Sequence, residues 1–282
     1  MTSTTDMTDM TASQRPVPAH APFSGLLGNE WIKLRSLRST YAVLGFGAFV
    51  AFGFAVSRSE NTVHEWSSLD AVARAAFPPL ADAYNGLTIG VLMIVAGSLG
   101  ALSIVGEYAN GMIRTTFTAV PDRTRVIAAK ALVLTATMLV VGVVVAGAAF
   151  WSSQLVLSGV GVGVSLHDPG VLRAIAATAL LVPVSALIGL GIGAIARHTA
   201  FAVVAVCVVL VVVPASFKTN VYLWFDDIMN TFPYVCWSRL VTLRAIPAGV
   251  PVPTISQAWL VYAIWPAIAV LVTVLLVRRK DV

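Results

Sequence analysis

The chain has 282 residues, of which 58% are hydrophobic and only 11% are charged. Because soluble domains carry about 25% charged residues, this composition excludes a soluble globular protein and indicates an integral membrane protein. The net charge of +5 does not indicate a nucleic-acid partner, since the basic residues flank hydrophobic segments, where Lys and Arg usually report membrane topology.

The N-terminal residues are polar and include prolines, without the basic region and apolar stretch that a signal peptide requires. We expect residues 1–22 to be a disordered cytoplasmic tail. We expect residues 23–282 to form a single transmembrane domain.

The segment GLLGNEWIKLRSLRST has the pattern of an amphipathic helix. Its apolar residues recur near spacings of three and four, at Leu26, Leu27, Trp31, Leu34 and Leu37. Its charged residues lie largely on other faces, at Glu30, Lys33, Arg35 and Arg38. We expect a helix at the membrane surface, where Trp31 suits the interface. The alternative is a basic flank that only sets orientation.

Six hydrophobic runs contain no Asp, Glu, Lys or Arg and approach the length of about 20 residues that one membrane crossing needs. The predicted spans are residues 41–56, 85–105, 131–155, 174–196, 200–217 and 258–277. A helix satisfies its own backbone hydrogen bonds in lipid, and the alternating pattern of an outer-membrane barrel is missing. The sequence therefore predicts an all-α membrane protein with six transmembrane helices.

The connections between the predicted spans differ in length. Residues 57–84 form an outer loop in which Pro78 and Pro79 end a short helix. A tight turn around Arg197 and His198 joins the fourth and fifth spans and makes them antiparallel neighbours.

The longest outer segment, residues 218–257, alternates aromatic and charged residues and is too polar to cross the membrane. We expect one or two short helices that lie at the outer face or dip into it. Pro183 in the fourth predicted span predicts a kink, because proline removes a backbone hydrogen bond and its ring clashes with the preceding turn.

The distribution of basic residues predicts the topology. With the N-terminus inside, the cytoplasmic segments hold twelve of the 18 Lys and Arg residues: Arg15, Lys33, Arg35, Arg38, Arg114, Arg123, Arg125, Lys130, Arg197, Arg278, Arg279 and Lys280. The outer segments hold Arg58, Arg74, Arg173, Lys218, Arg239 and Arg244. We therefore expect both termini in the cytoplasm.

The largest cytoplasmic loop is GEYANGMIRTTFTAVPDRTRVIAAK, residues 106–130. Its apolar residues Tyr108, Met112, Ile113 and Phe117 indicate a short amphipathic helix, which a loop that only retained positive charge would not need. Pro121 suits the first turn of the next helix. Glu107 stands where the backbone leaves the lipid, so it can pair with a base or accept backbone N–H groups.

The sequence offers no chemistry of its own for driving transport. It contains no phosphate-binding GxxxxGK[ST] loop, and the predicted spans contain no ionisable residue of the kind that ion-coupled carriers use. The Gly-rich run at residues 189–196 lies within a predicted span. There, and at Gly86 and Gly90, small residues permit close helix packing.

The sequence gives little support for a metal site or for a catalytic nucleophile. The four histidines fall in different segments, and Cys207 and Cys236 show no metal-binding spacing. Ser98 has no intramembrane histidine beside it, which argues against an intramembrane protease.

The ordered motifs resemble a known family. The helix with EW.KLRS.RST, the six spans and the loop with GEY.NGMIRTT..AVP.RTR...AK are similar to the membrane subunit of type 2 ABC exporters, the ABC-2 type permease family in its short actinobacterial form. The resemblance extends from about Gly28 to the RRK sequence near the end.

This resemblance implies a coupling helix after the second span that docks on a separate ATP-binding subunit. The implied coupling loop comprises Glu107, Gly111, Arg114, Pro121, Arg123, Arg125 and Lys130. The implied surface helix contributes Glu30, Trp31, Lys33 and Arg35. The resemblance also implies short re-entrant helices between the last two spans. Asp122 departs from the family, which often has a small or basic residue there, so the local ion pairing stays open.

The expected function is that of a permease subunit of an ATP-driven exporter for an amphipathic or apolar solute. Its expected partners are an ABC ATP-binding subunit, which binds the ATP and Mg²⁺, a second permease copy (homodimer or paralogue) and the lipid bilayer. We expect no cofactor in this chain and no ATP hydrolysis by it. The alternatives are a non-transporting membrane scaffold or sensor and, less favoured, an intramembrane enzyme.

Overall fold

The structure is a computed structural model that describes residues 22–36, 38–112, 116, 122–216, 223–244, 246 and 249–279. These residues form helices and connecting loops. The helices are α1 (Phe23–Ser36), α2 (Arg38–Glu65), α3 (Ala71–Ala76), α4 (Gly86–Ala109), α6 (Arg123–Leu157), α7 (Val171–Ala196), α8 (Thr199–Cys207), α9 (Val213–Ser216), α10 (Leu223–Met229), α11 (Pro233–Val241) and α12 (Ile255–Arg279). A 3₁₀ turn, η1 (Ser158–Val160), follows α6, and a π-helical segment, η2 (Val208–Val212), joins α8 to α9.

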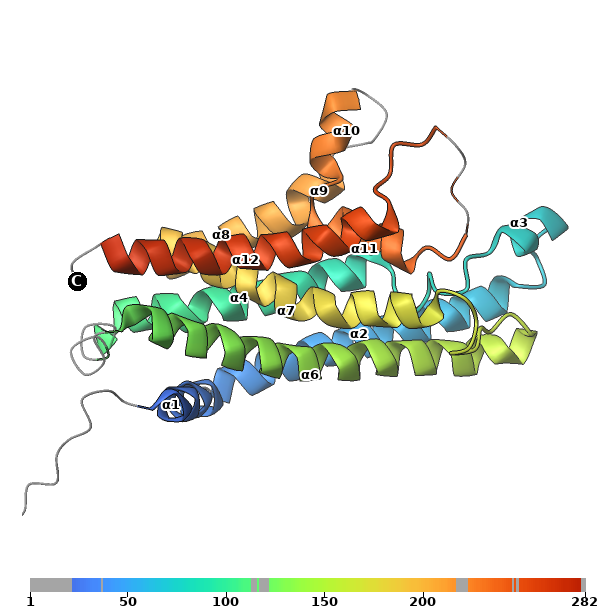
Figure 1. Cartoon of the computed structure of the whole chain (residues 1–282). Coiled ribbons are helices and arrows are strands. Elements are labelled where there is room, and N and C mark those ends of the chain that lie inside the picture. Colours follow the sequence, from blue (N-terminus) through green and yellow to red (C-terminus); the bar gives the residue numbers. More distant parts are fainter. Residues whose placement is uncertain are drawn as a thin grey trace, which may run out of the picture.

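The long helices lie side by side in one bundle (Figure 1). Helix α7 packs against α4, α6 and α12, and α2 packs against α6 and α4. Helix α1 is seen end-on in Figure 1, so it lies across the direction of the long helices. Helix α10 projects away from the bundle.

Five helices of the described part are long and apolar enough to cross a membrane. They are Gly86–Ala109, Arg123–Val160, Val171–Ala196, Thr199–Ser216 and Ile255–Arg279. The predicted all-helical membrane fold is therefore confirmed, and the second to sixth expected spans each have such a helix. The first expected span, residues 41–56, lies within α2, and its crossing stays a prediction because two of its side chains lie outside the described part.

Two helices extend beyond the predicted spans, whose bounds stay a prediction. The third span was expected to begin at residue 131, but α6 begins at Arg123. At about 1.5 Å per residue, the 35 residues of α6 measure about 52 Å, more than the roughly 30 Å of a hydrocarbon core. The second span also continues as helix to Ala109. Both helices therefore extend past their apolar runs.

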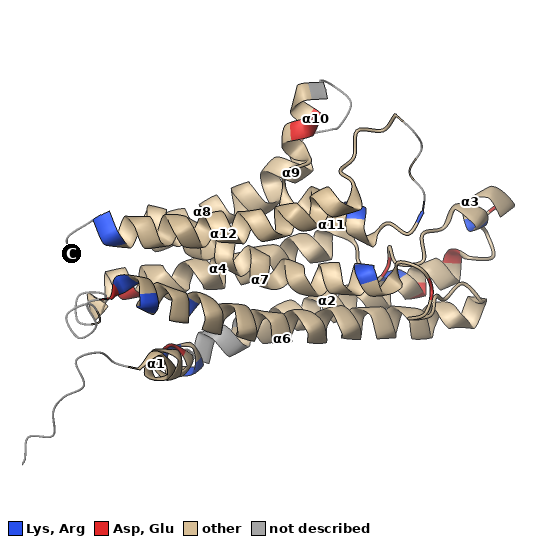
Figure 2. Ribbon diagram, viewed as in Figure 1, with Lys and Arg blue, Asp and Glu red and all other residues tan. Residues whose placement is uncertain are grey.

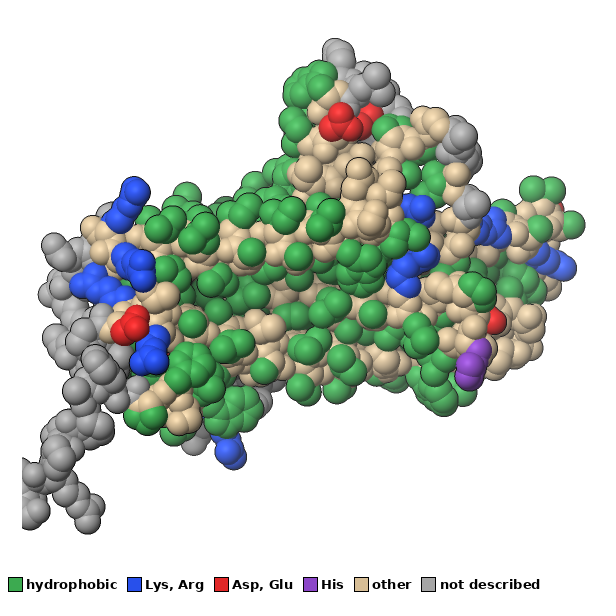
Figure 3. All heavy atoms as spheres, viewed as in Figure 1, with side chains coloured by type: hydrophobic (Ala, Val, Ile, Leu, Met, Phe, Trp, Pro, Cys, Tyr) green, Lys and Arg blue, Asp and Glu red, His purple; other side chains and the backbone are tan. Residues whose placement is uncertain are grey.

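Charged residues gather at the two ends of the bundle (Figure 2). We call these the α1 end, where α1 meets the end of α4 and the start of α6, and the α3 end, where α3 and the start of α4 lie. The surface between them is dominated by hydrophobic side chains (Figure 3). This distribution suits a bundle whose middle faces lipid and whose ends face water.

Glycines bring the backbones of α4 and α7 together. A side chain added at Gly100 would collide with the backbone of Ala186, and one added at Gly189 would collide with the backbone of Gly97. At Gly193 an added Cβ would lie 2.6 Å from the carbonyl oxygen of Ala101. The expected close packing at residues 189–196 is thus confirmed, whereas Gly86 and Gly90 face the side chains of Tyr234 and Val211 rather than a helix backbone.

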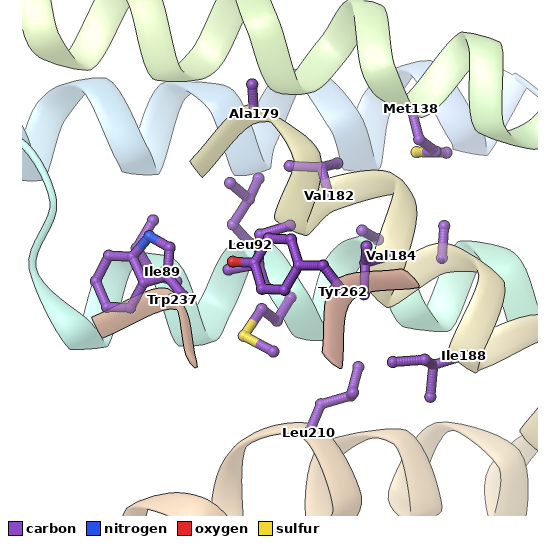
Figure 4. Close-up of a cluster of buried hydrophobic side chains, with 14 of the residues drawn as sticks. Ile89, Leu92, Met138, Ala179, Val182, Val184, Ile188, Leu210, Trp237 and Tyr262 are labelled. Carbon is purple, nitrogen blue, oxygen red and sulfur yellow. The ribbon is translucent and has the colours of Figure 1, made fainter. Parts of the chain in front are cut away.

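Side chains from six segments meet in the core (Figure 4). Ile89 and Leu92 of α4 lie near Val182 of α7, Leu210 of η2 and Tyr262 of α12. The short helix α11 is held in this core by Trp237, which is 3% exposed and donates a hydrogen bond of 3.0 Å from Nε1 to Oγ1 of Thr178. The segment between the last two long helices therefore contains two short helices, α10 and α11, and their position relative to the membrane stays a prediction.

Polar contacts fasten α6 at the α3 end. The hydroxyls of Ser59 in α2 and Ser153 in α6 share a hydrogen bond of 2.8 Å. The side chain of Gln154 donates to the carbonyl oxygen of Pro79 at 3.1 Å and accepts from the backbone N–H of Val164 at 2.7 Å. One glutamine thus joins α6 to the loops on both sides of it.

Prolines predicted the end of one helix and a kink in another. Helix α3 ends at Ala76, before Pro78, as expected. Helix α7 continues through Pro183, and the kink stays a prediction.

The turn between α7 and α8 consists of Arg197 and His198, and the two helices it joins are in contact, as expected.

Candidate functional site

Helix α1 places Glu30 against the bundle. Leu26 is 6% exposed and packs with Val126 and Ala129 of α6. Glu30 follows Leu26 by four residues, so it lies on the same face of the helix, and it is only 4% exposed. The expectation that Glu30 lies away from the apolar face was therefore wrong. Its charge is tolerated there because two lysines neutralise it.

Four charged residues from three helices form what we call the charge cluster: Glu30 and Lys33 of α1, Glu107 of α4 and Lys130 of α6. Lys33 Nζ lies 2.7 Å from Glu30 Oε1 and 2.7 Å from Glu107 Oε1. Lys130 Nζ lies 2.5 Å from Glu30 Oε2 and 3.0 Å from Glu107 Oε1. Each lysine thus contacts both carboxylates, and the cluster links α1, α4 and α6.

The hydrogen-bonding capacity of Lys130 is filled. Besides the two carboxylates, its ammonium group lies 3.4 Å from the carbonyl oxygen of Ser103, and a lysine has three protons to donate. The Lys130 side chain is 5% exposed. A buried charge is tolerated when it is paired and hydrogen-bonded, and removing one partner of such a pair costs about 3–5 kcal/mol. The cluster therefore fixes the relative positions of its three helices.

Lys33 is the most accessible member of the cluster, with 23% of its side chain exposed. Burial lowers the pKa of Lys33, but hydrogen bonds and charge interactions with Glu107 and Glu30 outweigh burial and raise it above the ordinary value of 10.5. Because the folded-state pKa is raised, Lys33 contributes stability below about pH 10.5, and this contribution is lost only as the pH rises through the folded-state pKa.

Gly111 ends the helix that carries Glu107. The last residue of α4 is Ala109, and the N–H of Asn110 donates to the carbonyl oxygen of Gly106 at 3.1 Å. Gly111 has φ of 66°, in the left-handed region that favours glycine after a helix C-terminus. The chain therefore turns away within one helical turn of the cluster.

Asp122 begins the helix that carries Lys130. Its carboxylate accepts a hydrogen bond of 3.2 Å from the backbone N–H of Arg125 and lies 3.7 Å from the Arg125 guanidinium. Asp122 is therefore the N-cap of α6. Its ion-pair partner, which the sequence left open, is Arg125. The side chain of Arg125 is 52% exposed.

The other basic residues of this end bind α12 or remain outside the cluster. Arg123 Nη1 donates to the carbonyl oxygen of Val277 at 2.8 Å, and Arg278 Nε donates to Thr124 Oγ1 at 2.9 Å. Trp31 is 49% exposed, and Arg35 is also exposed. The predicted site is therefore divided: Glu30, Lys33, Glu107 and Lys130 come together, while Trp31, Arg35, Arg123 and Arg125 do not join them.

The predicted coupling helix falls mainly on residues outside the described part of the chain. Arg114 and Pro121 also lie outside it. The described residues nearest to it are Met112, Thr116 and Asp122.

A contact that sequence reasoning missed lies next to Glu107. The guanidinium carbon of Arg197 lies 4.9 Å from the centre of the Tyr108 ring, at a distance typical of a cation–π contact. Arg197 has φ of 54° and is the one non-glycine residue with positive φ among those described. The sequence indicated a short turn at Arg197 and His198. It did not indicate that Arg197 contacts α4, because that contact depends on the packing of α4 against α7.

The charge cluster carries no net charge. It consists of two carboxylates and two ammonium groups that already neutralise one another. Within the described residues, no group of three or more His, Cys, Asp or Glu side chains is placed to hold a metal ion.

A family model described as ABC-2 family transporter protein matches residues 26–216. The chain belongs to the ABC-2 family. The match covers more than half of the chain and all four residues of the charge cluster. No curated protein matches the chain. Membership in the ABC-2 family identifies a membrane component of an ABC transporter system with an ATP-binding partner.

Proposed function

We propose that this chain is the permease subunit of an ATP-driven exporter that moves an amphipathic or apolar solute across the bacterial plasma membrane. In this proposal α2 is the first of six spans, both termini are cytoplasmic, and the α1 end faces the cytoplasm. The family match supports the role of a transporter subunit. The basic residues at the α1 end support this orientation.

The observation that carries the proposal is the charge cluster. The loop of residues 110–122 connects the helix of Glu107 to the helix of Lys130. A force applied to this loop by a bound ATPase acts on α4 and α6 together, and the cluster passes it to α1 through buried ion pairs. We therefore assign the cluster the role of a joint between the ATPase and the spans.

The ATP and Mg²⁺ of this exporter are bound by the partner subunit. Two permease copies, identical or paralogous, enclose the path of the solute, which is exposed alternately to the two sides of the membrane. A path for an amphipathic or apolar solute agrees with spans whose polar side chains are mainly Ser and Thr, such as Thr178 and Ser185.

The test is copurification of an ABC-type ATP-binding protein with the full-length chain in detergent. We expect recovery of this protein, ATP hydrolysis in the complex, and none by the chain alone. Arg125→Glu should weaken recovery by about tenfold, the loss expected for one charge-assisted contact. Arg123 is less suitable for this test because it also holds the end of α12.

Arg279→Glu is the matched control, since Arg279 is an exposed arginine at the end of α12. It should leave recovery unchanged. If the chain copurifies without an ABC-type protein, the proposal fails in favour of a non-transporting scaffold or sensor. Hydrolysis by the isolated chain would refute the assignment of ATP hydrolysis to the partner.

A further inference from the structure

A cavity of about 220 Å³ lies beside the charge cluster. Leu34 of α1, Leu102 of α4 and Leu134 of α6 form apolar parts of its wall, and Lys33 and Glu107 form charged parts. Pockets for drug-sized ligands measure about 300–1,000 Å³. This cavity is therefore sized for the polar head of a ligand rather than for a whole amphiphile.

Among the described residues, two of the four charged side chains that line the cavity, Lys33 and Glu107, have hydrogen-bonding capacity left over. Lys33 gives two of its three protons to Glu30 and Glu107. The hydrogen bonds from Lys33 and Lys130 to Glu107 both reach Oε1, and the carboxylate has a second oxygen. The cavity thus offers one cationic donor and one anionic acceptor close together.

The charge balance limits the ligand further. The cluster contains two positive and two negative side chains, so a ligand with net charge would leave it unbalanced. A ligand with an ammonium group for Glu107 and a phosphate group for Lys33 keeps the balance and matches both groups. The ammonium needs N–H groups, because a carboxylate accepts hydrogen bonds.

The position of the cavity indicates the source of the ligand. Its lining residues come from α1, the second half of α4 and the first part of α6, so it lies at the charged α1 end, next to the apolar middle of the bundle. Leu102 in its wall is 37% exposed, which provides an apolar surface for a hydrocarbon chain. Helix α1 crosses the bundle at this level (Figure 1). An amphiphile held here would keep its chains in the bilayer and its polar end in the cavity.

We propose that this cavity binds the head group of a zwitterionic membrane lipid with a primary ammonium, of the phosphatidylethanolamine class. The ammonium binds Glu107, the phosphate binds Lys33, and the acyl chains pass Leu102. The site does not depend on the ATPase, so it can be tested on the permease alone.

The experiment measures lipid retention on the full-length chain in detergent by native mass spectrometry, after incubation with phosphatidylethanolamine, phosphatidylcholine or phosphatidylglycerol. Phosphatidylethanolamine should be retained about tenfold more than phosphatidylcholine, whose quaternary ammonium has no N–H to donate to Glu107. It should also be retained more than the anionic phosphatidylglycerol.

Gly106 allows the cavity to be filled without changing the cluster. It lines the cavity, and a Cβ added there meets no atom within 4 Å. Gly106→Leu should abolish the preference for phosphatidylethanolamine. Gly147→Leu is the control, because Gly147 also has open space and lies on α6 away from the cavity. It should retain the preference.

Each contrary result has a defined meaning. Equal retention of the three lipids would overturn recognition of the head group, and an unchanged preference in Gly106→Leu would overturn this cavity as the site. If soluble glycerophosphoethanolamine bound as well as phosphatidylethanolamine, the proposal that the ligand is a membrane lipid would be wrong. None of these outcomes bears on copurification of the ATPase, so the proposed function is tested separately.

Discussion

Glu107 accepts hydrogen bonds from lysines on two different helices, which makes one carboxylate a shared contact of α1, α4 and α6. Its side chain is 7% exposed, so it is more enclosed than its expected place at the water boundary suggested. Loss of its charge must therefore affect stability as well as coupling, and an experiment on this residue has to separate the two.

Glu107→Gln should lower the free energy of unfolding by about 3 kcal/mol, because it leaves two lysines to share the single carboxylate of Glu30. Adding Lys33→Met restores a neutral cluster that retains the 2.5 Å contact between Lys130 and Glu30. We expect the double variant to recover most of the stability but not transport, since the link from α1 to α4 is lost. Thermal unfolding in detergent and transport at matched membrane amounts measure the two effects.

Glu65→Ala is the control for this series, because Glu65 is an exposed acid at the end of α2. It should leave both measurements unchanged. Recovery of transport together with stability in the double variant would show that the cluster only balances buried charge, and Glu107 would lose its assigned role in coupling.

The pairing of α4 with α7 depends on residues with a very small side chain or none. The positions facing each other across this contact are Gly97, Gly100, Ala186, Gly189 and Gly193. Dispersion contacts are the main attraction between helices in lipid, and they strengthen as the backbones approach. The backbones of the two helices therefore approach closely at these positions.

Gly100→Ala should destabilise the bundle by about 1–3 kcal/mol, because the added methyl group would collide with the backbone of Ala186, which cannot rotate away. Gly147→Ala should be neutral or slightly stabilising, since an added methyl group meets no atom within 4 Å there and alanine favours helix. Thermal unfolding of the two variants in the same detergent gives the comparison. Equal unfolding temperatures would contradict the close packing of α4 and α7.

At the scale of the whole molecule, the basic residues divide between two ends that lie far apart along the bundle (Figure 2). Arg123 lies at the start of α6 near the α1 end, and Glu65 lies at the end of α2 toward the α3 end. The proposed topology places the first position in the cytoplasm and the second outside.

A cysteine introduced at Arg123 should react with an impermeant thiol reagent only after the membrane is permeabilised, whereas one introduced at Glu65 should react in intact cells. The natural Cys236 should not contribute, because it is fully buried and burial raises the pKa of its thiol to about 12. The unmodified chain measures any background from Cys207. Labelling of position 123 but not position 65 in intact cells would reverse the proposed orientation.

Sequence reasoning was most successful where one local property decides the structure. Length and hydropathy placed the apolar helices, and small residues at residues 189–196 indicated a close helix contact. It was less successful where the partner of a residue comes from elsewhere in the chain. Glu30 was assigned to a polar face because the sequence does not show that Lys130 meets it. The contact of Arg197 with Tyr108 depends on tertiary packing in the same way.

Helix α6 is held by side-chain contacts near both of its ends. Lys130 binds Glu30 and Glu107 near one end, and Gln154 binds the loops at Pro79 and Val164 near the other. The two attachments are 24 residues apart, about 36 Å along a continuous helix. A helix that stays straight moves as a rod, so a tilt imposed at Lys130 displaces the loops that Gln154 holds. In the proposed exporter, opening at the far side of the membrane would then require no relay of side chains through the apolar core.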